Sequence, residues 1–167
     1  MPTDVYIGVG SNIDPEQNVS AAFVELERRL GPIESSSAWR NPPVGFEGDA
    51  FLNLVFRAET ALSPTEIEAI LNEIEGAAGR VRDGRGPGPR SLDLDLLLYG
   101  TLVDPLLRLP HPDVRGYGFV LCPLAELAPD LVHPISGMSM KDEWLAMERG
   151  VTQLEKIEFE KPSREAR

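Results

Sequence analysis

The sequence contains few of the residues on which several common active sites depend. Its 167 residues include a single cysteine, Cys122, which excludes an intramolecular disulfide and a cysteine-based zinc site. Because Cys122 follows an apolar run, we expect it to be a small buried residue and not a nucleophile. Only two histidines are present, and the zinc-binding motif H-E-x-x-H does not occur.

Long apolar stretches and targeting signals are also missing. No run approaches the ~18 apolar residues that are needed to span a bilayer. Residues 1–10 contain neither a basic segment nor a long apolar segment, so no signal peptide is recognisable. We therefore expect a cytoplasmic protein that does not bind membranes.

Lysine is absent before Lys141, which removes the cation of the usual phosphate-binding P-loop, and no G-x-x-x-x-G-K-[ST] motif occurs. The segment 8–13 (GVGSNI) begins like a dinucleotide-binding fingerprint, but Ile13 stands where that motif has its third glycine. The same segment also lacks the G-x-S-x-G pattern of a nucleophile elbow.

The charge balance is strongly acidic, with 16 Lys+Arg against 27 Asp+Glu and a net charge of −11. Such a chain repels phosphate backbones, which argues against a general nucleic-acid or anionic-membrane binder. Thirteen of the basic residues are arginines, and four of these lie between positions 80 and 90. The 42% of hydrophobic residues is typical of one globular domain with a substantial core.

The first half of the chain alternates strand and helix patterns. Residues 4–10 are β-branched and aromatic, which indicates a strand. A helix is expected to start at Asp14, as N-cap, and Pro15 and to end at Gly31-Pro32. Its apolar face comprises Val19, Ala22, Phe23, Leu26 and Leu30. An edge strand is expected within 33–40.

The next elements repeat this alternation. Residues 41–50 contain two prolines and two glycines and predict a long loop. Residues 51–59 alternate as a half-buried strand. Ser63 and Glu66 form a capping box that starts a helix reaching to Gly79. Residues 80–90 predict a second irregular loop, and residues 91–99 a further strand.

The resulting order predicts an α+β fold, a ferredoxin-like β-α-β-β-α-β sandwich. A short hairpin after Gly100 and helices near 119–127 and 139–149 would form a C-terminal helical extension. We expect residues 1–149 to form a single domain. Residues 150–167 are rich in charge and are expected to be a flexible tail.

Two aspartates on the last strand of this pattern are candidates for chemistry. Asp93 and Asp95 point to the same face, with Cβ atoms roughly 6–7 Å apart. The alternating leucines Leu92, Leu94, Leu96 and Leu98 would point into the core. Two neighbouring carboxylates repel each other unless a cation neutralises them, and Mg²⁺ suits carboxylates combined with phosphate oxygens. The alternative is a solvent-facing polar side of an amphipathic strand.

The loop before this strand carries Arg80, Arg82, Arg85 and Arg90. Guanidinium groups bind phosphate oxygens in a bidentate manner and keep their charge. An arginine loop that leads into an aspartate pair suits phosphoryl transfer, with metal on one side of a polyphosphate and guanidinium groups on the other. The alternative is a solvated basic loop.

An acceptor could be held by the residues around the first loop. Phe51 and Asn53 share one strand face, and Pro42-Pro43-Val44-Gly45 precede them. A ring, an amide and a stiff backbone can hold a flat heterocycle by stacking and hydrogen bonds. Phe51 could equally be a core residue.

The sequence resembles the 6-hydroxymethyl-7,8-dihydropterin pyrophosphokinase family of folate biosynthesis from about residue 4 to residue 135. The matching segments occur in the family's order, and P-R-x-L-D-L-D-L-L is the most specific of them. They are GVGSN (8–12), NPPVG (41–45), FLN (51–53), GRVR (79–82), GPRSLDLD (88–95), PHP (110–112) and FVLCPLAELAP (119–129).

The resemblance implies an ATP-dependent pyrophosphokinase (diphosphotransferase) that moves pyrophosphate from ATP to the pterin hydroxymethyl group and releases AMP. It implies two Mg²⁺ ions, with Asp93 and Asp95 as metal ligands, and Arg80 and Arg90 as catalytic residues that stabilise charge during transfer. The implied nucleotide-binding residues are Asn72, Glu75, Arg82, Arg90, Leu96 and His111. The implied pterin-binding residues are Pro42, Pro43, Val44, Phe51, Asn53 and Phe119. Loops 41–50 and 80–90 would be lids that close on ATP.

The sequence departs from the family pattern at several positions. Gly86-Pro87 stand where the family commonly has Arg-Trp, and Tyr117 stands where it usually has an arginine. Leu106 occupies the position of a nucleotide-contacting arginine, and Arg108 lies two residues away. Because of these departures, an alternative stays open, namely that the chain is a divergent paralogue. Such a paralogue would bind a pterin or a nucleotide with weak or no turnover.

The expected ligands are thus ATP and a reduced pterin, and the chain is expected to be a monomer. A ferredoxin-like RNA-binding module would need a basic face with exposed aromatic residues. The net charge and the aspartate pair argue against it.

Overall fold

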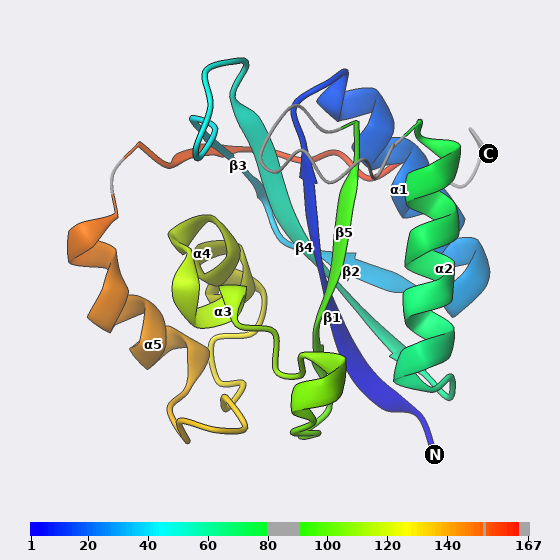
Figure 1. Cartoon of the computed structure of the whole chain (residues 1–167), viewed down its shortest axis with the longest axis vertical. Coiled ribbons are helices and arrows are strands. Elements are labelled where there is room, and N and C mark those ends of the chain that lie inside the picture. The colour runs from blue at the N-terminus through cyan, green and yellow to red at the C-terminus, as the bar shows by residue number, and fades with distance from the viewer. Residues whose placement is uncertain (80–90, 152, 164–167) are drawn as a thin grey trace.

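Strands and helices follow one another in the expected order (Figure 1). The computed structural model describes residues 1–79, 91–151 and 153–163. The first part comprises β1 (Thr3–Ser11), α1 (Pro15–Leu30), β2 (Ile33–Ser35), β3 (Ala38–Asn41), β4 (Phe51–Thr60) and α2 (Pro64–Ala77). The second part comprises β5 (Asp93–Tyr99), the 3-10 turn η1 (Pro105–Leu107), α3 (Asp113–Gly116), α4 (Gly118–Leu127), α5 (Met140–Met147), the 3-10 turn η2 (Glu148–Gly150) and β6 (Glu155–Ile157).

The strands form an antiparallel sheet with the order β5-β1-β4-β3-β6, and β2 also pairs with β4. β1 and the β2–β3 segment are joined through α1, and β4 is inserted between them. This split β-α-β arrangement confirms the predicted ferredoxin-like fold. Among the described residues, no helix is both long and apolar enough to cross a membrane.

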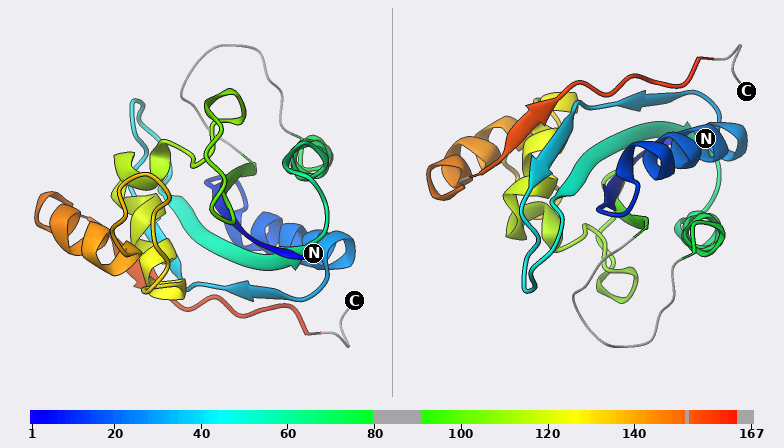
Figure 2. Two further views of the ribbon diagram at one scale, coloured as in Figure 1. Left: turned by 90° about the horizontal axis from the view of Figure 1, so that it is seen from below. Right: turned by 90° about the horizontal axis from the view of Figure 1, so that it is seen from above.

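Helices cover both faces of the sheet (Figure 2). One face packs against α1 and α2 and forms the larger core, which includes Phe23, Leu26 and Phe56. The other face packs against α4 and α5, with Val55, Leu97 and Leu121 in the second core. β4 was expected to be half-buried, but it is buried on both faces because the C-terminal helices add this third layer.

Local sequence signals account for most of the helix ends. The predicted apolar face of α1 is buried, and Gly31 ends this helix with φ +87°. The capping box of Ser63 and Glu66 is present at the start of α2. Asp14 occupies the predicted N-cap position with Pro15 directly after it, but its backbone is left-handed with φ 41° and its side chain makes no capping hydrogen bond. The amide of Asn18 instead donates to the Ile13 carbonyl.

An irregularity in the pairing of β1 with β5 changes the face of the sheet on which some β5 side chains lie. Tyr6 pairs with Leu98 but the neighbouring Ile7 pairs with Leu96, so Leu97 is an extra residue. Leu94 and Leu96 lie in the first core as expected, whereas Leu98 lies with Leu97 in the second core. The prediction that Leu98 shares a face with Leu96 is therefore wrong, because the bulge reverses the alternation.

The segment after Gly150 packs against the domain and corrects the expectation of a flexible tail beginning there. β6 pairs antiparallel with β3, with Ala38 opposite Ile157. Beyond β6, the Phe159 ring lies 6.2 Å from both Phe23 and Phe56 (ring centroids). The predicted edge strand within 33–40 is thus two short strands, and β6 covers the outer side of β3.

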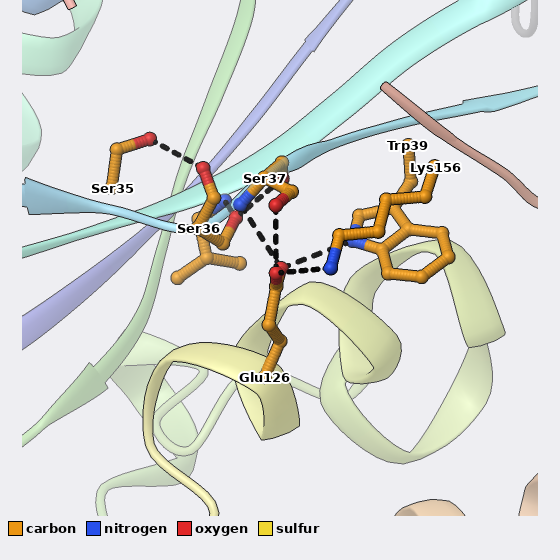
Figure 3. A network of polar contacts seen from close by, with 7 residues as sticks. Ser35, Ser36, Ser37, Trp39, Glu126 and Lys156 are labelled. Carbon is orange, nitrogen blue, oxygen red and sulfur yellow. Dashed lines mark hydrogen bonds and ion pairs between the residues drawn. The ribbon is translucent and has the colours of Figure 1, made fainter. Parts of the chain in front are cut away.

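Glu126 on α4 ties the second helical layer to the sheet (Figure 3). One carboxylate oxygen accepts from the Ser37 amide (3.0 Å) and the Trp39 indole (3.3 Å), and the other accepts from the Ser37 hydroxyl (2.7 Å). Lys156 of β6 adds an ion pair at 3.4 Å. Burial alone would raise the pKa of Glu126, but these donors and Lys156 outweigh it and lower the pKa.

Cys122 is buried in α4, as the sequence predicts. Burial, reinforced by the negative charge of Glu126, raises the pKa of its thiol to about 12. The thiol therefore stays protonated at neutral pH, which makes it a poor nucleophile.

Replacing Phe159 tests whether the C-terminal segment stabilises the domain. Phe159→Ala is expected to lower the free energy of unfolding by about 2 kcal/mol, because it removes a partly buried ring from the first core. Urea unfolding followed by circular dichroism measures this change. The exposed neighbour Glu158→Ala is the control and should stay within about 0.5 kcal/mol of the wild type. If the two variants have equal free energies of unfolding, the claim that the C-terminal segment stabilises the domain is wrong.

Replacing Glu126 should have a pH-dependent effect. Because the folded pKa lies below the ordinary value of 4.5, its charge stabilises the fold above that pH and loses this effect as pH falls through the folded pKa. Glu126→Gln should therefore cost about 1–2 kcal/mol at pH 7 and clearly less near pH 3.

The control for this measurement is Glu160→Gln, which removes the same charge from an exposed position. Urea unfolding at both pH values gives the comparison. A destabilisation by Glu126→Gln that does not change with pH, or that matches the control, would contradict the assigned network.

Candidate active site

A cavity of about 260 Å³ lies where β1, β4 and β5 meet loop 42–50 and the start of α4. Its floor is β1, which contributes Gly8 and Gly10. A Cβ atom added at Gly10 would stand 3.1 Å from the Asn53 side-chain oxygen, which is tighter than ordinary contact. Glycine at this position therefore keeps the floor open beside Asn53.

The strand register places one functional group on each side of this floor. Gly10 pairs with Asn53 of β4 and with Asp93 of β5, and Gly8 pairs with Asp95. Both aspartates line the cavity, and the Asp95 side chain is 43% exposed. Since neighbouring strands are about 4.8 Å apart, Asn53 and Asp93 are held roughly 10 Å apart across β1.

Asn53 is oriented by its neighbour on β3. Its amide nitrogen donates to the side-chain oxygen of Asn41, and the Asn41 amide donates to the Pro42 carbonyl (3.0 Å). Asn41 and Asn53 are both buried. This chain of hydrogen bonds fixes which atoms of Asn53 face the cavity, because a buried amide keeps the orientation that satisfies its donors.

Four aromatic rings line the cavity in two pairs. Phe46 meets Phe51 edge to face, with centroids 6.0 Å apart and an 85° angle between the planes. Tyr117 stacks on Phe119, with centroids 4.9 Å apart and planes inclined by 23°. These walls come from the loop before β4 and from the start of α4, and they suit a flat ring system.

His111 lies next to Asp95 at the aspartate end. Its Nε2 is 3.9 Å from Asp95 Oδ1, and its Nδ1 accepts from the Asp113 amide (3.1 Å). Burial lowers the pKa of His111, Arg108 adds to this effect, and Asp113 and Asp93 oppose it. The imidazole is therefore neutral at pH 7, and its proton is on Nε2, which faces the carboxylate.

Several possible ligands for a cation converge here. Asp95, His111 and Asp113 each offer a ligand atom within 4.8 Å of the others. Asp93 adds a second carboxylate from the same strand face. Because Mg²⁺ prefers oxygen ligands, the two carboxylates of β5 fit it better than the imidazole does.

Hydrogen bonds hold the chain at the mouth of the cavity. The Ser11 hydroxyl donates to the Ser91 carbonyl (2.5 Å), just before β5. The Asn12 amide donates to the Asp49 carbonyl (3.1 Å) in loop 42–50. The end of β1 therefore connects both segments that flank the cavity.

Comparison with known proteins agrees with this arrangement. The sequence model of the 7,8-dihydro-6-hydroxymethylpterin-pyrophosphokinase (HPPK) family matches residues 6–129. The chain is 42% identical over 138 residues to a 2-amino-4-hydroxy-6-hydroxymethyldihydropteridine pyrophosphokinase of Pseudomonas aeruginosa, covering 78% of this chain and 83% of that one. It is 40% identical over 146 residues to the protein of the same name from Methylorubrum extorquens, covering 84% and 90%. The chain belongs to the HPPK family.

Solved structures agree on the fold. The HPPK-DHPS protein of Plasmodium falciparum with pteroate aligns with a TM-score of 0.76 at 10% identity, covering 93% of this chain and 48% of that one. The chain thus spans about half the length of that solved protein. The likeness supports the ferredoxin-like architecture of this chain.

Most of the residues that are predicted to bind the pterin and the metal lie together in the structure. The cavity is lined by Val44, Phe51, Asn53, Asp93, Asp95 and Phe119. Pro42 and Pro43 instead line an adjoining hollow of about 480 Å³, which shares Val44, Tyr117 and Phe119 with the cavity. Phe51 lines the cavity and belongs to neither hydrophobic core, so the alternative that it is a core residue is wrong.

Other predicted residues lie elsewhere. Asn72 is exposed on α2, and the side chain of Leu96 is buried in the first core, so only its backbone could meet a nucleotide. Arg80, Arg82 and Arg90 lie outside the described residues, as do Arg85 and Gly86-Pro87.

Glu75, which is predicted to bind the nucleotide, also makes a contact within the fold. Its side chain is buried, and Oε1 accepts from the Leu94 amide at 2.7 Å. Leu94 lies between Asp93 and Asp95, so α2 holds the strand segment that carries the two carboxylates. Glu75 therefore positions β5 from the face of the sheet that packs against α2.

Sequence reasoning missed several lining residues. Gly10, Phe46 and Asp113 carried no role in the prediction, and Tyr117 was noted only as a departure from the family pattern. The glycines of β1 had a usable signal, since two glycines inside a strand indicate close approach of another group. No local signal marks Phe46, because its position against Phe51 depends on the loop conformation.

Replacing Glu75 tests its positioning role. Glu75→Ala leaves the Leu94 amide without its acceptor and should lower the free energy of unfolding by about 1–3 kcal/mol. Glu75→Gln keeps an acceptor oxygen and should lose less than half of that. Urea unfolding and amide hydrogen exchange at Leu94 measure both effects. An unchanged exchange rate at Leu94 in Glu75→Ala would refute the assignment.

Proposed function

We propose that this chain transfers pyrophosphate from ATP to the hydroxymethyl oxygen of 6-hydroxymethyl-7,8-dihydropterin and releases AMP. The observation that carries this proposal is a single cavity with aromatic walls and a buried amide at one side and two carboxylates at the other. Membership of the HPPK family supports the same reaction.

The pterin would occupy the aromatic side of the cavity. Its flat ring system would stack between the Phe51 and Phe119 walls, where a planar heterocycle finds favourable ring contacts. Asn53, held by Asn41, would hydrogen-bond the polar edge of the ring. The backbone from Pro42 to Val44 would close the remaining side. This placement directs the hydroxymethyl group toward β5.

The aspartate side fits magnesium. Asp93 and Asp95 are hard oxygen donors on one strand face, partly open to the cavity, as Mg²⁺ requires when it also takes phosphate oxygens. We propose that they hold the two Mg²⁺ ions expected with ATP, which would neutralise charge on the phosphates. Binding these ions also removes the repulsion between the two carboxylates.

His111 would act beside these ligands. Its neutral imidazole presents Nε2–H toward Asp95, and a phosphate oxygen bound there would accept this proton in a hydrogen bond. Arg80, Arg82 and Arg90 would supply positive charge from the neighbouring loop, and this role stays a prediction from the sequence. Guanidinium groups that meet developing phosphate charge are typical of phosphoryl transfer.

Replacing one carboxylate tests the reaction. Asp95→Asn keeps the shape of the side chain but removes the negative charge that would bind the metal ion. Formation of AMP from ATP, the hydroxymethyl dihydropterin and Mg²⁺ should fall at least about a hundredfold. Omitting the metal should abolish AMP formation in the wild type, and adding Mg²⁺ should restore it.

The matched control is Asp130→Asn, which removes the same charge from an exposed position outside the cavity. It should retain AMP formation within about twofold. If Asp95→Asn keeps wild-type activity, the metal assignment is wrong. If the wild type binds a pterin but forms no AMP with Mg²⁺, the pyrophosphokinase reaction itself is wrong.

A further inference from the structure

Glu143 is a buried carboxylate on α5 that is not among the residues lining the cavity. Its side chain is only 8% exposed. The guanidinium Nε of Arg115 on α3 donates to one of its oxygens at 3.3 Å and lies 3.2 Å from the other. Because a buried carboxylate is costly without a partner, this ion pair fixes Arg115 relative to α5.

The short helix α3 connects this ion pair to the aspartate end of the cavity. Asp113 begins α3, its amide donates to His111 Nδ1 (3.1 Å), and its carboxylate lies 3.8 Å from the same nitrogen. Residues two apart in sequence lie about 200° apart around a helix, so Arg115 meets α5 on one side while Asp113 meets His111 on the other. A rotation of α3 would therefore change both contacts together.

Other contacts hold α3 against the sheet but leave its rotation less defined. The His111 amide donates to the Leu97 carbonyl (2.8 Å), which fixes the start of this segment on β5. Val114 is fully buried in the second core. Apolar packing is non-directional, whereas a charge-assisted hydrogen bond such as that of Arg115 with Glu143 depends on direction. The ion pair therefore sets the rotation of the helix.

We propose that Glu143 is a positioning residue for the nucleotide end of the site, which acts through Arg115 and α3 on His111. With α3 fixed, the Asp113 amide occupies Nδ1, and the ring keeps its Nε2–H toward Asp95, where a phosphate oxygen would bind. The proposal rests on the proposed function in taking ATP as the ligand there. Its physical basis is preorganisation, because a donor that is already oriented loses little freedom when the phosphate arrives.

The direct test is the nitrogen NMR spectrum of the His111 ring in the ligand-free protein at pH 8. In the wild type, Nδ1 should have the shift of an unprotonated acceptor and Nε2 that of a protonated donor. Arg115→Ala should bring the two shifts closer together, because a loosened Asp113 amide lets the proton exchange between the two nitrogens. The control Glu148→Gln, which removes an exposed charge directly after α5, should leave both shifts unchanged.

Equilibrium binding measures the consequence at the site. The probe is α,β-methylene-ATP, a non-hydrolysable analogue, titrated with Mg²⁺. Arg115→Ala should raise its Kd about three- to tenfold, as the loss of one hydrogen bond does. KM for the pterin should stay within about twofold, because the aromatic walls lie on the other side of the cavity. A role in stability alone would ease unfolding in urea without changing this Kd.

A double-mutant cycle shows whether the two residues act as a unit. Glu143→Ala should raise the Kd by about the same factor as Arg115→Ala, and the double variant should be no weaker in binding than either single variant. The double variant also removes the buried charge that Arg115→Ala leaves unpaired. It therefore supplies the comparison with the wild type if Arg115→Ala does not fold.

The outcomes distinguish this proposal from the proposed function. If Glu143→Ala keeps the His111 shifts and the Kd of the wild type, the positioning role is wrong even where the wild type forms AMP. If the effects of the two single variants multiply in the double variant, Glu143 does not act through Arg115 and the proposal is wrong. If the wild type forms no AMP, the proposed reaction is wrong, whereas a change of the His111 shifts in the Arg115 and Glu143 variants alone still supports the positioning role.

Discussion

The pairing of β1 with β4 on one side and with β5 on the other is the constraint on which the rest of the site depends. Gly10 lies opposite both Asn53 and Asp93, so one strand register sets the separation of the ring-binding amide and the carboxylates. A slip of one residue would turn these side chains to the opposite face of the sheet, into the core against α1 and α2. The buried faces on both sides of the sheet exclude such a slip energetically.

The second helical layer supplies one wall of the cavity, which the sheet alone does not provide. α4 contributes Phe119, the short α3 begins at Asp113 beside His111, and β6 fastens the chain that follows α5. The Glu126 network joins this layer to β3, which leads into the loop that carries Pro42, Pro43 and Phe46. The two walls of the cavity are therefore mechanically linked, although they are far apart in the sequence.

Much of the site could be predicted from the sequence because its signals are local. The alternation Leu-Asp-Leu-Asp placed Asp93 and Asp95 on one face, and the resemblance to the HPPK family pointed to Phe51, Asn53 and Phe119. The failures have physical causes that are not local. A bulge beside Leu97 turned Leu98 to the other core, and pairing with β3 ordered a segment that is rich in charge and looked like a tail. Asp14 lies at the predicted N-cap position, yet its backbone is left-handed and its side chain makes no capping hydrogen bond.

Glu75 and Tyr117 show that predicting the role of a residue from the sequence is limited in the same way. A carboxylate on α2 can contact a ligand or a backbone amide, and only the docking of α2 against β5 decided that Glu75 holds Leu94. Tyr117 differs from the family pattern by the loss of a charge, whereas the structure shows a ring stacked on Phe119. Neither role could be deduced from residue type, because both depend on the partner that the fold supplies.

By itself, the sequence determined the class of fold, the acidic net charge, the aspartate pair and the family. These follow from periodicity, composition and short motifs, which are properties of neighbouring residues. The tertiary structure alone decided that Gly10 separates Asn53 from Asp93, that Phe46 and Tyr117 back the cavity walls, and that the C-terminal segment closes the sheet. Those features depend on which residues distant in the chain come into contact, and contact is set by the burial of both faces of the sheet.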